Sequence, residues 1–441
     1  MTAAARELGP LTRALFAGID FNKRKTIIAA VSGGSDSLAL LDLAATALAG
    51  RSTELVAVTI DHNLRPEAAD EAGQVAAICA NLGLRHMTLR WENADPAAGG
   101  LIARAREARY RLLAEAADTL ATDLVLVGHT ANDQAETVAM RAQRGRPEKT
   151  GWDRGGAGMA RATLYDGRIW LVRPLLDLDR QELRAHLSAR GLTWIDDPTN
   201  VDLRYERPRI RAGLGDITVL SSAAGKAADL RAAMGARAAR LIDAHVDMPS
   251  PGLIRLNPAL LRADDDEAVL YALRCLLATA GGQDHLPDIA RARSLRARLG
   301  EAGLCATLSR ARVDVRRGGI FLMREGRNLP RIPARQGIVW DGRHRLRTAP
   351  KRPGVMIAAP GQEALARGTG GHTDLPEHLV GIALSAEPRL VGEGPDESHD
   401  TAAFERRVSP FAQYLGHYDL ELATALARVL GTAPPPPAPF A

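Results

Sequence analysis

Short apolar runs alternate with amphipathic stretches from residue 26 onwards. The apolar runs are rich in Val, Ile and Leu and predict buried parallel strands at residues 26–31, 55–61, 86–91 and 123–129. Between them, apolar positions recur with helical spacing at residues 37–48, 67–82, 100–120 and 132–142. A fifth strand at 168–176 and a helix at 179–191 continue the pattern. The alternation predicts an α/β fold with a doubly wound parallel sheet in this part of the chain.

The loop after the first predicted strand, residues 32–37, reads SGGSDS and has the composition of an anion site. Its glycines let the backbone approach an oxyanion, its serines supply hydroxyl donors, and the helix that follows adds free N–H groups. Its acid is suited to a hard cation that bridges phosphate oxygens. A Gly-Ser turn without a ligand is the simpler alternative. We expect ATP phosphates to bind at Ser32, Gly33, Gly34, Ser35, Asp36 and Ser37, with Asp36 as the metal ligand.

This loop differs from a Walker A motif because it contains no lysine. In a Walker A loop the lysine neutralises the β and γ phosphates of the nucleotide. Here we expect Mg²⁺ and arginines from elsewhere in the chain to balance the phosphate charge.

Residues that follow the other strands are candidates as well, because ligands of doubly wound sheets bind at the carboxyl ends of the strands. The sequence DHNLR (61–65) follows the second strand and GHTANDQAET (128–137) follows the fourth. His129 and Asp133 lie about one helical turn apart, so both would face the phosphates, and Glu136 lies on nearly the same face. The alternative is an ordinary helix start, capped by Asn132 and carrying an acid in its first turn.

Charge, cysteine content and the lack of long apolar runs indicate in which cell compartment the protein works. The chain of 441 residues has a net charge of +5 and a pI of about 9.3, which is compatible with a polyanionic partner. Its cysteines, Cys79, Cys275 and Cys305, are far apart, so neither a disulfide framework nor a CxxC site is predicted. The N-terminus lacks a signal-peptide pattern, and no run approaches the ~20 apolar residues that span a bilayer. We therefore expect a cytoplasmic protein.

Several blocks together resemble one known family. They are SGGSDS, DHNLRPEAADEA (61–72), AREARY (105–110), GHTANDQAET, RPLL (173–176) and WIDDPTNVDLRYERPRIR (194–211). In this order and with this spacing they resemble tRNA(Ile)-lysidine synthetase, a member of the N-type ATP pyrophosphatase superfamily. The resemblance covers roughly residues 28–213 and implies an adenine nucleotide alpha hydrolase-like fold.

The resemblance also implies an activity. Enzymes of this family adenylate C2 of the wobble cytidine of a CAU-anticodon isoleucine tRNA and join lysine to it, and they release AMP and pyrophosphate from ATP. The implied substrates are therefore ATP, L-lysine and that tRNA, with Mg²⁺ as cofactor. The oligomeric state stays open, a homodimer included.

Site roles follow partly from the reaction and partly from the resemblance. An ammonium cannot attack, so a base must take its proton, and either His129 or Asp133 is placed to do so. Glu136 would hold the polar end of the lysine, and Arg109 resembles the family's arginine near the adenylated base. The arginine-rich segment RYERPRIR would grip phosphates and the anticodon, unless it is only a solvated basic helix start. The predicted tRNA-binding residues are Arg204, Arg207, Arg209 and Arg211.

The sequence departs from the family pattern at three places. Asn63 replaces a usual glycine, and Thr130 stands where a second histidine is common. The charged, glycine-rich stretch 140–161 replaces a usual arginine and Gly-Ser loop. We interpret that stretch as a lid over the base-binding crevice, with a disordered loop as the equal alternative.

Beyond residue 213 the pattern is weaker. Helices are predicted at 222–245 and 265–280, and a hairpin at 306–325. We divide the chain into a catalytic domain (1–213), an appended tRNA-contacting domain (214–330) and a C-terminal domain (331–441). The two appended domains would be α and α+β, and the chain would end in a disordered Pro-rich tail.

Other functions remain to be weighed. A thiolase of the same superfamily would need reactive cysteines near the crevice, and Cys79 lies within a predicted helix. An amide-forming synthetase acting on a metabolite would not need the arginine-rich segment. A non-catalytic RNA-binding protein would need neither Asp36 nor Asp133.

Overall fold

The computed structural model describes residues 12, 14–92, 94–95, 98–144, 155–196, 204, 206–350, 352–361, 375–392 and 403–440. The chain divides into two compact units. Unit 1 comprises Met1–Arg231, Gly416–Tyr418 and Pro437–Ala441, and unit 2 comprises Ala232–Leu415 and Asp419–Pro436. The borders drawn at 213 and 330 do not coincide with this division, because the chain passes from one unit to the other within the single helix α8 (Ile217–His245).

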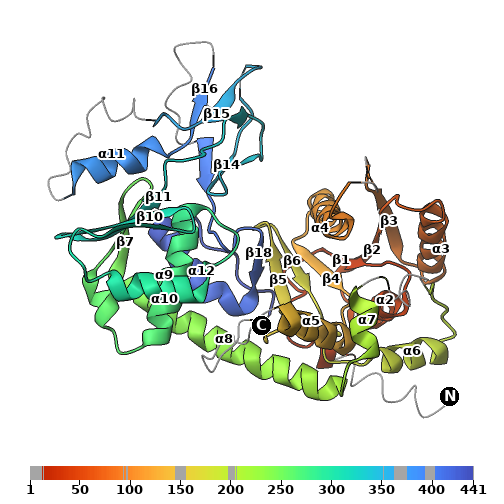
Figure 1. Cartoon of the computed structure of the whole chain (residues 1–441). Coiled ribbons are helices and arrows are strands. Elements are labelled where there is room, and N and C mark those ends of the chain that lie inside the picture. Colours follow the sequence, from red (N-terminus) through yellow and green to blue (C-terminus); the bar gives the residue numbers. More distant parts are fainter. Residues whose placement is uncertain are drawn as a thin grey trace. The chain divides into compact units, whose positions relative to one another are not determined.

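Unit 1 is built on a parallel sheet (Figure 1). Its parallel strands lie in the order β6-β4-β1-β2-β3, with bounds β1 (Thr26–Ala30), β2 (Glu54–Asp61), β3 (Arg85–Arg90), β4 (Leu124–Val127) and β6 (Ile169–Val172). The order reverses at β1, between β4 and β2. Such a switch point is where ligands bind in open α/β sheets. The predicted doubly wound parallel sheet is confirmed.

Helices follow the strands as the apolar spacing predicts. They are α2 (Ser35–Leu48), α3 (Ala68–Asn81), α4 (Leu101–Thr119), α5 (Ala131–Arg144) and α6 (Arg180–Ala189). The central strands are closed to solvent on both faces, and Ile27, Ile28 and Leu126 are fully buried. This burial explains why these strands read as continuous apolar runs rather than as alternating ones.

One strand of unit 1 was not predicted. β5 (Ala162–Tyr165) pairs antiparallel with β6 through a tight turn at Asp166 and Gly167, both of which have positive φ. The Asp-Gly pair is a hairpin signal, but β5 is only four residues long and follows directly after a glycine-rich stretch. Of the predicted lid at 140–161, residues 145–154 lie outside the described part of the chain.

Unit 2 contains an antiparallel sheet of order β7-β8-β11-β10-β9. Its strands are β7 (Val246–Ser250), β8 (Leu253–Leu256), β9 (Cys305–Leu308), β10 (Ala311–Arg316) and β11 (Gly319–Arg324). The β10–β11 pair confirms the predicted hairpin, and α8 and α9 (Asp266–Gly281) confirm the predicted helices. The short helix α10 (Ile289–Arg298) follows α9.

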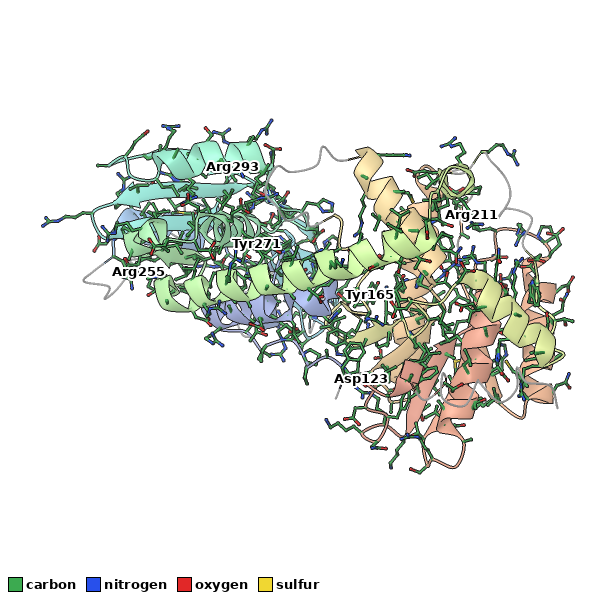
Figure 2. The ribbon with its side chains drawn as sticks, turned by 90° about the horizontal axis from the view of Figure 1, so that it is seen from below. Asp123, Tyr165, Arg211, Arg255, Tyr271 and Arg293 are labelled. Atoms are coloured by element: carbon green, nitrogen blue, oxygen red, sulfur yellow. The ribbon has the colours of Figure 1, made fainter. Side chains whose placement is uncertain are left out.

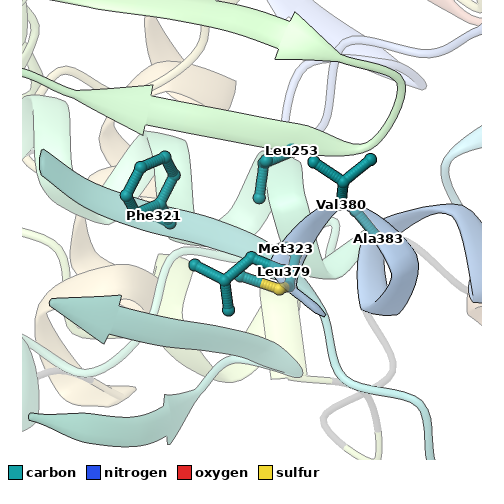
Figure 3. Close-up of a cluster of buried hydrophobic side chains, with 6 residues drawn as sticks. All are labelled: Leu253, Phe321, Met323, Leu379, Val380 and Ala383. Atoms are coloured by element: carbon teal, nitrogen blue, oxygen red, sulfur yellow. The ribbon is translucent and has the colours of Figure 1, made fainter. Parts of the chain in front are cut away.

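A small hydrophobic core joins this sheet to helix α11 (Glu377–Ser385) (Figure 3). Leu379, Val380 and Ala383 of the helix pack against Phe321 and Met323 of β11. Both sets of side chains are almost completely buried, so the helix is a fixed part of unit 2.

Two three-stranded sheets complete unit 2. One has the order β12-β15-β16 and the other β13-β14-β17. Their bounds are β12 (Ile332–Pro333), β13 (Val339–Trp340), β14 (His344–Leu346), β15 (Met356–Ala358), β16 (Arg389–Val391) and β17 (Phe404–Arg406). Trp340 is fully buried at their centre. Helix α12 (Leu420–Leu430) follows strand β18 (Tyr414–Gly416), which is ordered next to β5 at the edge of the sheet that unit 1 is built on.

The end of the Pro-rich segment is ordered, so the prediction of a disordered tail is wrong there. Phe440 forms an isolated β-bridge with Ile19, and the Asp20 N–H donates to the Pro439 carbonyl at 3.1 Å. These backbone hydrogen bonds give the tail a fixed partner, which composition alone does not reveal. Among the described residues no helix is both long and apolar enough to cross a membrane.

Candidate active site

A cleft of about 1150 Å³ opens at the carboxyl edge of the parallel sheet in unit 1. The loop after β1, the DHNLR segment after β2 and residues 127–133 after β4 all line it. The predicted convergence of these strand ends is therefore present. Two arginines of α6, Arg180 and Arg184, complete the wall beside the loop.

The loop after β1 is shaped by close packing as well as by its glycines. Gly33 has a φ of 86°, and a Cβ there would lie 2.7 Å from the Ile195 side chain. Ile195 also donates its N–H to the Gly33 carbonyl at 2.9 Å. The segment before Asp196 thus supports the loop, so position 33 needs a glycine for both conformation and space.

The serines of the loop are bonded to the loop itself. The Ser37 hydroxyl donates to the Gly34 carbonyl at 2.9 Å and accepts from the Ser32 N–H at 3.1 Å. Gly34 is the residue before α2, so the helix N-terminus opens at the loop. This arrangement gives the fixed N–H groups and partial positive charge that anions favour.

Gly128 brings the end of β4 against the loop. A Cβ at this position would lie 2.9 Å from the Asp36 backbone carbonyl oxygen and 3.1 Å from the Ser37 Cα. The end of β4 is therefore in direct backbone contact with the first turn of α2, and residues 128–133 take their position from it.

Asp36 is held by an arginine. The Arg180 Nε donates to Asp36 Oδ2 at 2.8 Å, and the Ser35 hydroxyl donates to Asp36 Oδ1 at 3.1 Å. Burial raises the pKa of the Asp36 carboxyl, and the nearby Asp133 carboxylate adds to this although Arg180 opposes it. The site therefore favours a second cation or a proton near Asp36.

Asp133 lies in the first turn of α5 and bonds to Thr130, the residue before the helix. Its Oδ2 accepts hydrogen bonds from the Thr130 N–H at 2.9 Å and from the Thr130 hydroxyl at 3.0 Å. Its Oδ1 lies 3.6 Å from Arg180 Nη2 and 3.9 Å from Arg207 Nη1. Burial would raise the pKa of Asp133, but the interaction with His129, the Arg180 charge and the Thr130 N–H hold it below its usual range.

The alternative interpretation of this helix start, with Asn132 as the cap, is wrong. Thr130 occupies the position before the helix, and the Asn132 side chain instead accepts a hydrogen bond from the Arg180 N–H at 2.9 Å. Asn132 thereby ties the start of α6 to the start of α5. His129 lines the same cleft, where burial and the Arg173 charge lower its pKa to about 3.

Glu136 forms an ion pair with an arginine of this chain, whereas it was predicted to hold the lysine substrate. Its carboxylate is fully buried, and its Oε1 accepts from the Arg211 Nε at 2.7 Å. Figure 2 labels Arg211, which lies in helix α7 (Glu206–Ala212). Glu136 Oε2 has no hydrogen-bond partner among the described residues. The role of Glu136 in holding lysine stays a prediction.

Arg109 faces the cleft from α4. Its Nη2 lies 3.3 Å from the Nε2 of His62, which stands against the Trp91 ring in an edge-to-face contact. Burial and the Arg109 charge lower the pKa of His62 to about 4. A neutral His62 can therefore accept a hydrogen bond from Arg109 and fix its direction.

The predicted tRNA-binding arginines divide into two pairs. Arg207 and Arg211 line the cleft, where they lie near Asp133 and Glu136. Arg204 and Arg209 are exposed. Within the block of residues 194–211, residues 197–203 and 205 lie outside the described part of the chain.

Comparison with known proteins gives the family. The PP-loop domain family matches residues 4–217. A tRNA(Ile)-lysidine synthase of Mesorhizobium japonicum is 47% identical over 98% of this chain and 97% of its own length. Another, from Rhizobium meliloti, is 38% identical over 92% of each chain. The chain belongs to the tRNA(Ile)-lysidine synthase family.

One of the solved structures that are similar to this chain is a thiolase. It is the U34-tRNA thiolase NcsA from Methanococcus maripaludis, at 14% identity with a TM-score of 0.42, over 51% of this chain and 76% of that chain. In this member of the lysidine synthase family, Cys79 is buried in α3 and burial raises its pKa to about 11. A thiol of that kind is unreactive at neutral pH. The described residues also contain no group of three or more His, Cys, Asp or Glu that could hold a metal.

Sequence reasoning missed three residues of this lysidine synthase family site. Arg180 and Arg184 lie in a helix that was predicted, and their spacing of four residues places them on one face. Ile195 belongs to the recognised WIDDPTN block, but its packing on Gly33 required the fold. Because the loop has no lysine, arginines elsewhere in the chain were expected to balance the phosphate charge, but the sequence did not show which ones.

Proposed function

We propose that this chain is an ATP-dependent ligase that forms lysidine at the wobble cytidine of an isoleucine tRNA with a CAU anticodon. The observation that carries the proposal is the 47% identity to a tRNA(Ile)-lysidine synthase, which extends over 98% of the chain. The cleft supports it, because the loop after β1 and the start of α5 meet there.

The first step would be adenylation of the cytosine. The C2 oxygen attacks the α phosphorus of ATP, the bond to the β phosphate breaks, and pyrophosphate leaves. The loop of residues 32–37 and the N-terminus of α2 would hold the departing charge in fixed N–H and hydroxyl groups. Arg109, directed by His62, would lie near the adenylated base.

The donor set of the cleft suits Mg²⁺. The carboxylates of Asp36 and Asp133 lie on either side of Arg180, and a hard divalent cation prefers such oxygen ligands. Mg²⁺ commonly uses one or two carboxylates together with substrate phosphates, so a larger acidic cluster is not required. Asp36 would hold the ion, which when bound supplies charge neutralisation at the phosphates.

The second step would be attack by the lysine ε-amine on C2, with release of AMP. The ammonium must first lose a proton to His129 or Asp133. Both groups have lowered pKa values, so the surrounding arginines must also lower the pKa of the incoming ammonium. Glu136 would hold the polar end of the lysine after Arg211 exchanges partners.

Arg204, Arg207, Arg209 and Arg211 would bind the tRNA, two of them at the mouth of the cleft and two on the exposed side. Charge contacts of this kind position a nucleic acid without specifying its sequence. Because tRNA and ATP are the substrates, we place the reaction in the cytoplasm.

Incorporation of labelled lysine tests the proposal. Purified protein with Mg²⁺ and ATP should transfer lysine to isoleucine tRNA that carries a CAU anticodon, and should produce AMP and pyrophosphate. Methionine tRNA with the same anticodon is the matched control and should stay unlabelled. Release of ADP and orthophosphate, or transfer to a small metabolite without tRNA, would overturn the proposal.

The same assay separates the two candidate bases. If Asp133 is the base, Asp133→Asn should leave adenylation of the tRNA largely intact and lower lysine transfer by about 10²–10⁴-fold. If His129 is the base, His129→Asn should give that pattern instead. Equal loss of both steps in Asp133→Asn would place Asp133 in the ATP step.

A further inference from the structure

The loop of residues 32–37 has no lysine, and yet two negatively charged phosphates must leave together from it. The cleft holds several arginines, of which Arg180 and Arg184 on α6 are nearest to the loop. Arg184 donates to the exposed Asp196 at 3.0 Å and lies 3.4 Å from the Ser35 hydroxyl. Arg180 is deeper, with a side chain that is 19% exposed.

Arg180 bridges two acids from different elements. Its Nε bonds to Asp36 at the start of α2, and its Nη2 lies 3.6 Å from Asp133 in the first turn of α5. Both carboxylates are largely buried, with side-chain exposures of 16% and 11%. Arg180 thus contacts both acids, in the place where Asp36 was predicted to be the metal ligand, and Arg207 adds a second positive charge 3.9 Å from Asp133.

This arrangement cannot lose its cation without cost. If Arg180 turned away alone, two nearby carboxylates would stay buried without a positive charge between them. If a divalent cation takes its place on Asp36, the guanidinium is released beside the loop. A guanidinium offers paired N–H donors that match phosphate oxygens, so it would then serve as the phosphate partner that a lysine provides in Walker A loops.

The backbone around Arg180 is fixed, so this exchange needs only a side-chain movement. Its N–H is bonded to Asn132, and the preceding Asp179 forms a capping box with Glu182. Nearly two turns further along α6, His186 bonds to the buried Asp42 of α2 at 2.8 Å, and the C-cap residue Arg190 bonds to the same carboxylate at 3.0 Å. The helix is therefore clamped to α2, and the guanidinium stays within reach of the loop.

We propose that Arg180 is a pyrophosphate-binding residue that Asp36 holds in the nucleotide-free enzyme and releases when a divalent cation binds to Asp36. The proposal rests on the proposed function, because it assumes that the loop holds the leaving phosphates. It assigns a role in the reaction to a residue of the RPLLDLDR segment that the sequence did not single out.

Direct binding tests this role without relying on turnover. Isothermal titration of the full chain with inorganic pyrophosphate and Mg²⁺ should give a Kd about 10- to 100-fold higher for Arg180→Gln than for the unchanged chain, because charge-assisted hydrogen bonds are lost. Arg111→Gln is the matched control. It removes an exposed arginine of α4 that pairs with Glu115 and lies outside the cleft, so its Kd should stay within about twofold.

Manganese binding tests the exchange on Asp36. With Mn²⁺ alone and electron paramagnetic resonance as the readout, Arg180→Gln should bind the ion about tenfold more tightly than the unchanged chain, since the competing cation is gone. Arg111→Gln should match the unchanged chain. Arg180→Lys keeps the charge with fewer paired donors, so both of its affinities should lie between the two extremes.

The outcomes are distinguishable. Unchanged pyrophosphate affinity in a folded Arg180→Gln protein, or unchanged Mn²⁺ affinity, would overturn the proposal. If Arg180→Gln does not fold, as judged by its thermal unfolding midpoint, Arg180→Lys decides, and affinities identical to those of the unchanged chain would overturn it. Failure of the unchanged chain to transfer lysine, with pyrophosphate binding still dependent on Arg180, would remove the proposed function and leave this site standing.

Discussion

Gly128 shows how a single missing side chain positions the site. The Cβ of an alanine would lie 2.9 Å from a backbone oxygen of Asp36, and backbone cannot turn aside as a side chain can. We predict that Gly128→Ala displaces the loop, lowers the free energy of unfolding by about 1–3 kcal/mol and abolishes measurable ATP binding by titration calorimetry.

Gly73 provides the control for this prediction. It lies in α3, and a Cβ added there would meet no atom within 4 Å, so Gly73→Ala should leave ATP binding unchanged. It should also raise stability by about 0.5–1 kcal/mol through helix propensity. Normal ATP binding by Gly128→Ala would contradict the importance of the contact between the end of β4 and the first turn of α2.

The histidines of the cleft predict a dependence of stability on pH. Burial lowers the pKa of His62 to about 4, whereas an unfolded histidine titrates near 6.5. Between these pH values the unfolded chain binds a proton at His62 that the folded chain does not bind. The free energy of unfolding therefore falls as the pH drops from about 6.5 towards 4. His129 acts in the same direction, since its pKa is lowered to about 3.

Urea unfolding at pH 7.5 and pH 5 measures this dependence. We predict that the unchanged chain loses stability at pH 5 and that His62→Gln loses less. Replacing the exposed His285 by Gln should leave the difference as it is. Equal losses in all three proteins would show that His62 titrates in the folded chain as it does in the unfolded one.

A site residue could be predicted from the sequence only if it belongs to a short motif and does not depend on contacts with distant residues. The loop of residues 32–37, His129 and Asp133 belong to such short local motifs, and all of them line or shape the cleft. The partner of Asp36 lies 144 residues away, and only the folded sheet brings the two together. Glu136 was placed on the correct helix, but its ion pair with Arg211 spans 75 residues and was not foreseen.

At the scale of elements, the clamp between α2 and α6 sets the geometry of the loop wall. Asp42 is 4% exposed and accepts hydrogen bonds from both His186 and Arg190. We predict that Asp42→Asn lowers the free energy of unfolding by about 2 kcal/mol, because an amide replaces the acceptor of two charge-assisted bonds. Chemical denaturation followed by circular dichroism measures this loss.

Arg190→Gln should cost less than Asp42→Asn, at most about 1 kcal/mol, because the Arg190 side chain is 52% exposed and its charge is screened. A cost equal to that of Asp42→Asn would mean that His186 contributes nothing to the clamp.

Hydrophobic periodicity predicted the helices and strands correctly where they are long and well buried. The parallel strands and the helices between them were predicted because burial imposes continuous apolar runs and amphipathic faces. The strands of unit 2 after residue 330 have only two or three residues each, so no period can be read from them. β5 was missed for a similar reason, as a four-residue strand.

At the scale of the whole molecule, each unit has its own polar core. In unit 2 the buried Asp341 accepts from Arg324 Nε at 2.9 Å and from Arg343 Nε at 2.9 Å, and Arg324 is 1% exposed. We predict that Asp341→Ala lowers the stability of unit 2 by about 3–5 kcal/mol, since it leaves buried arginine charges without their acid.

Scanning calorimetry together with ATP titration separates the two units. Asp341→Ala should lower the unfolding temperature of unit 2 while ATP still binds to unit 1, whose cleft is lined entirely by residues 30–211. Loss of ATP binding in a protein whose unit 1 is folded would contradict this independence. The sequence alone could not foresee this division, because composition changes little where α8 passes from one unit to the other.

The bridge between Ile19 and Phe440 has a consequence for synthesis on the ribosome. The residues that line the cleft are all translated early, but the strand partner of Ile19 emerges only after the whole of unit 2. Until Pro439 and Phe440 have been translated, the nascent chain would therefore carry every residue that lines the cleft, while the backbone of Ile19 and Asp20 would lack these hydrogen-bond partners.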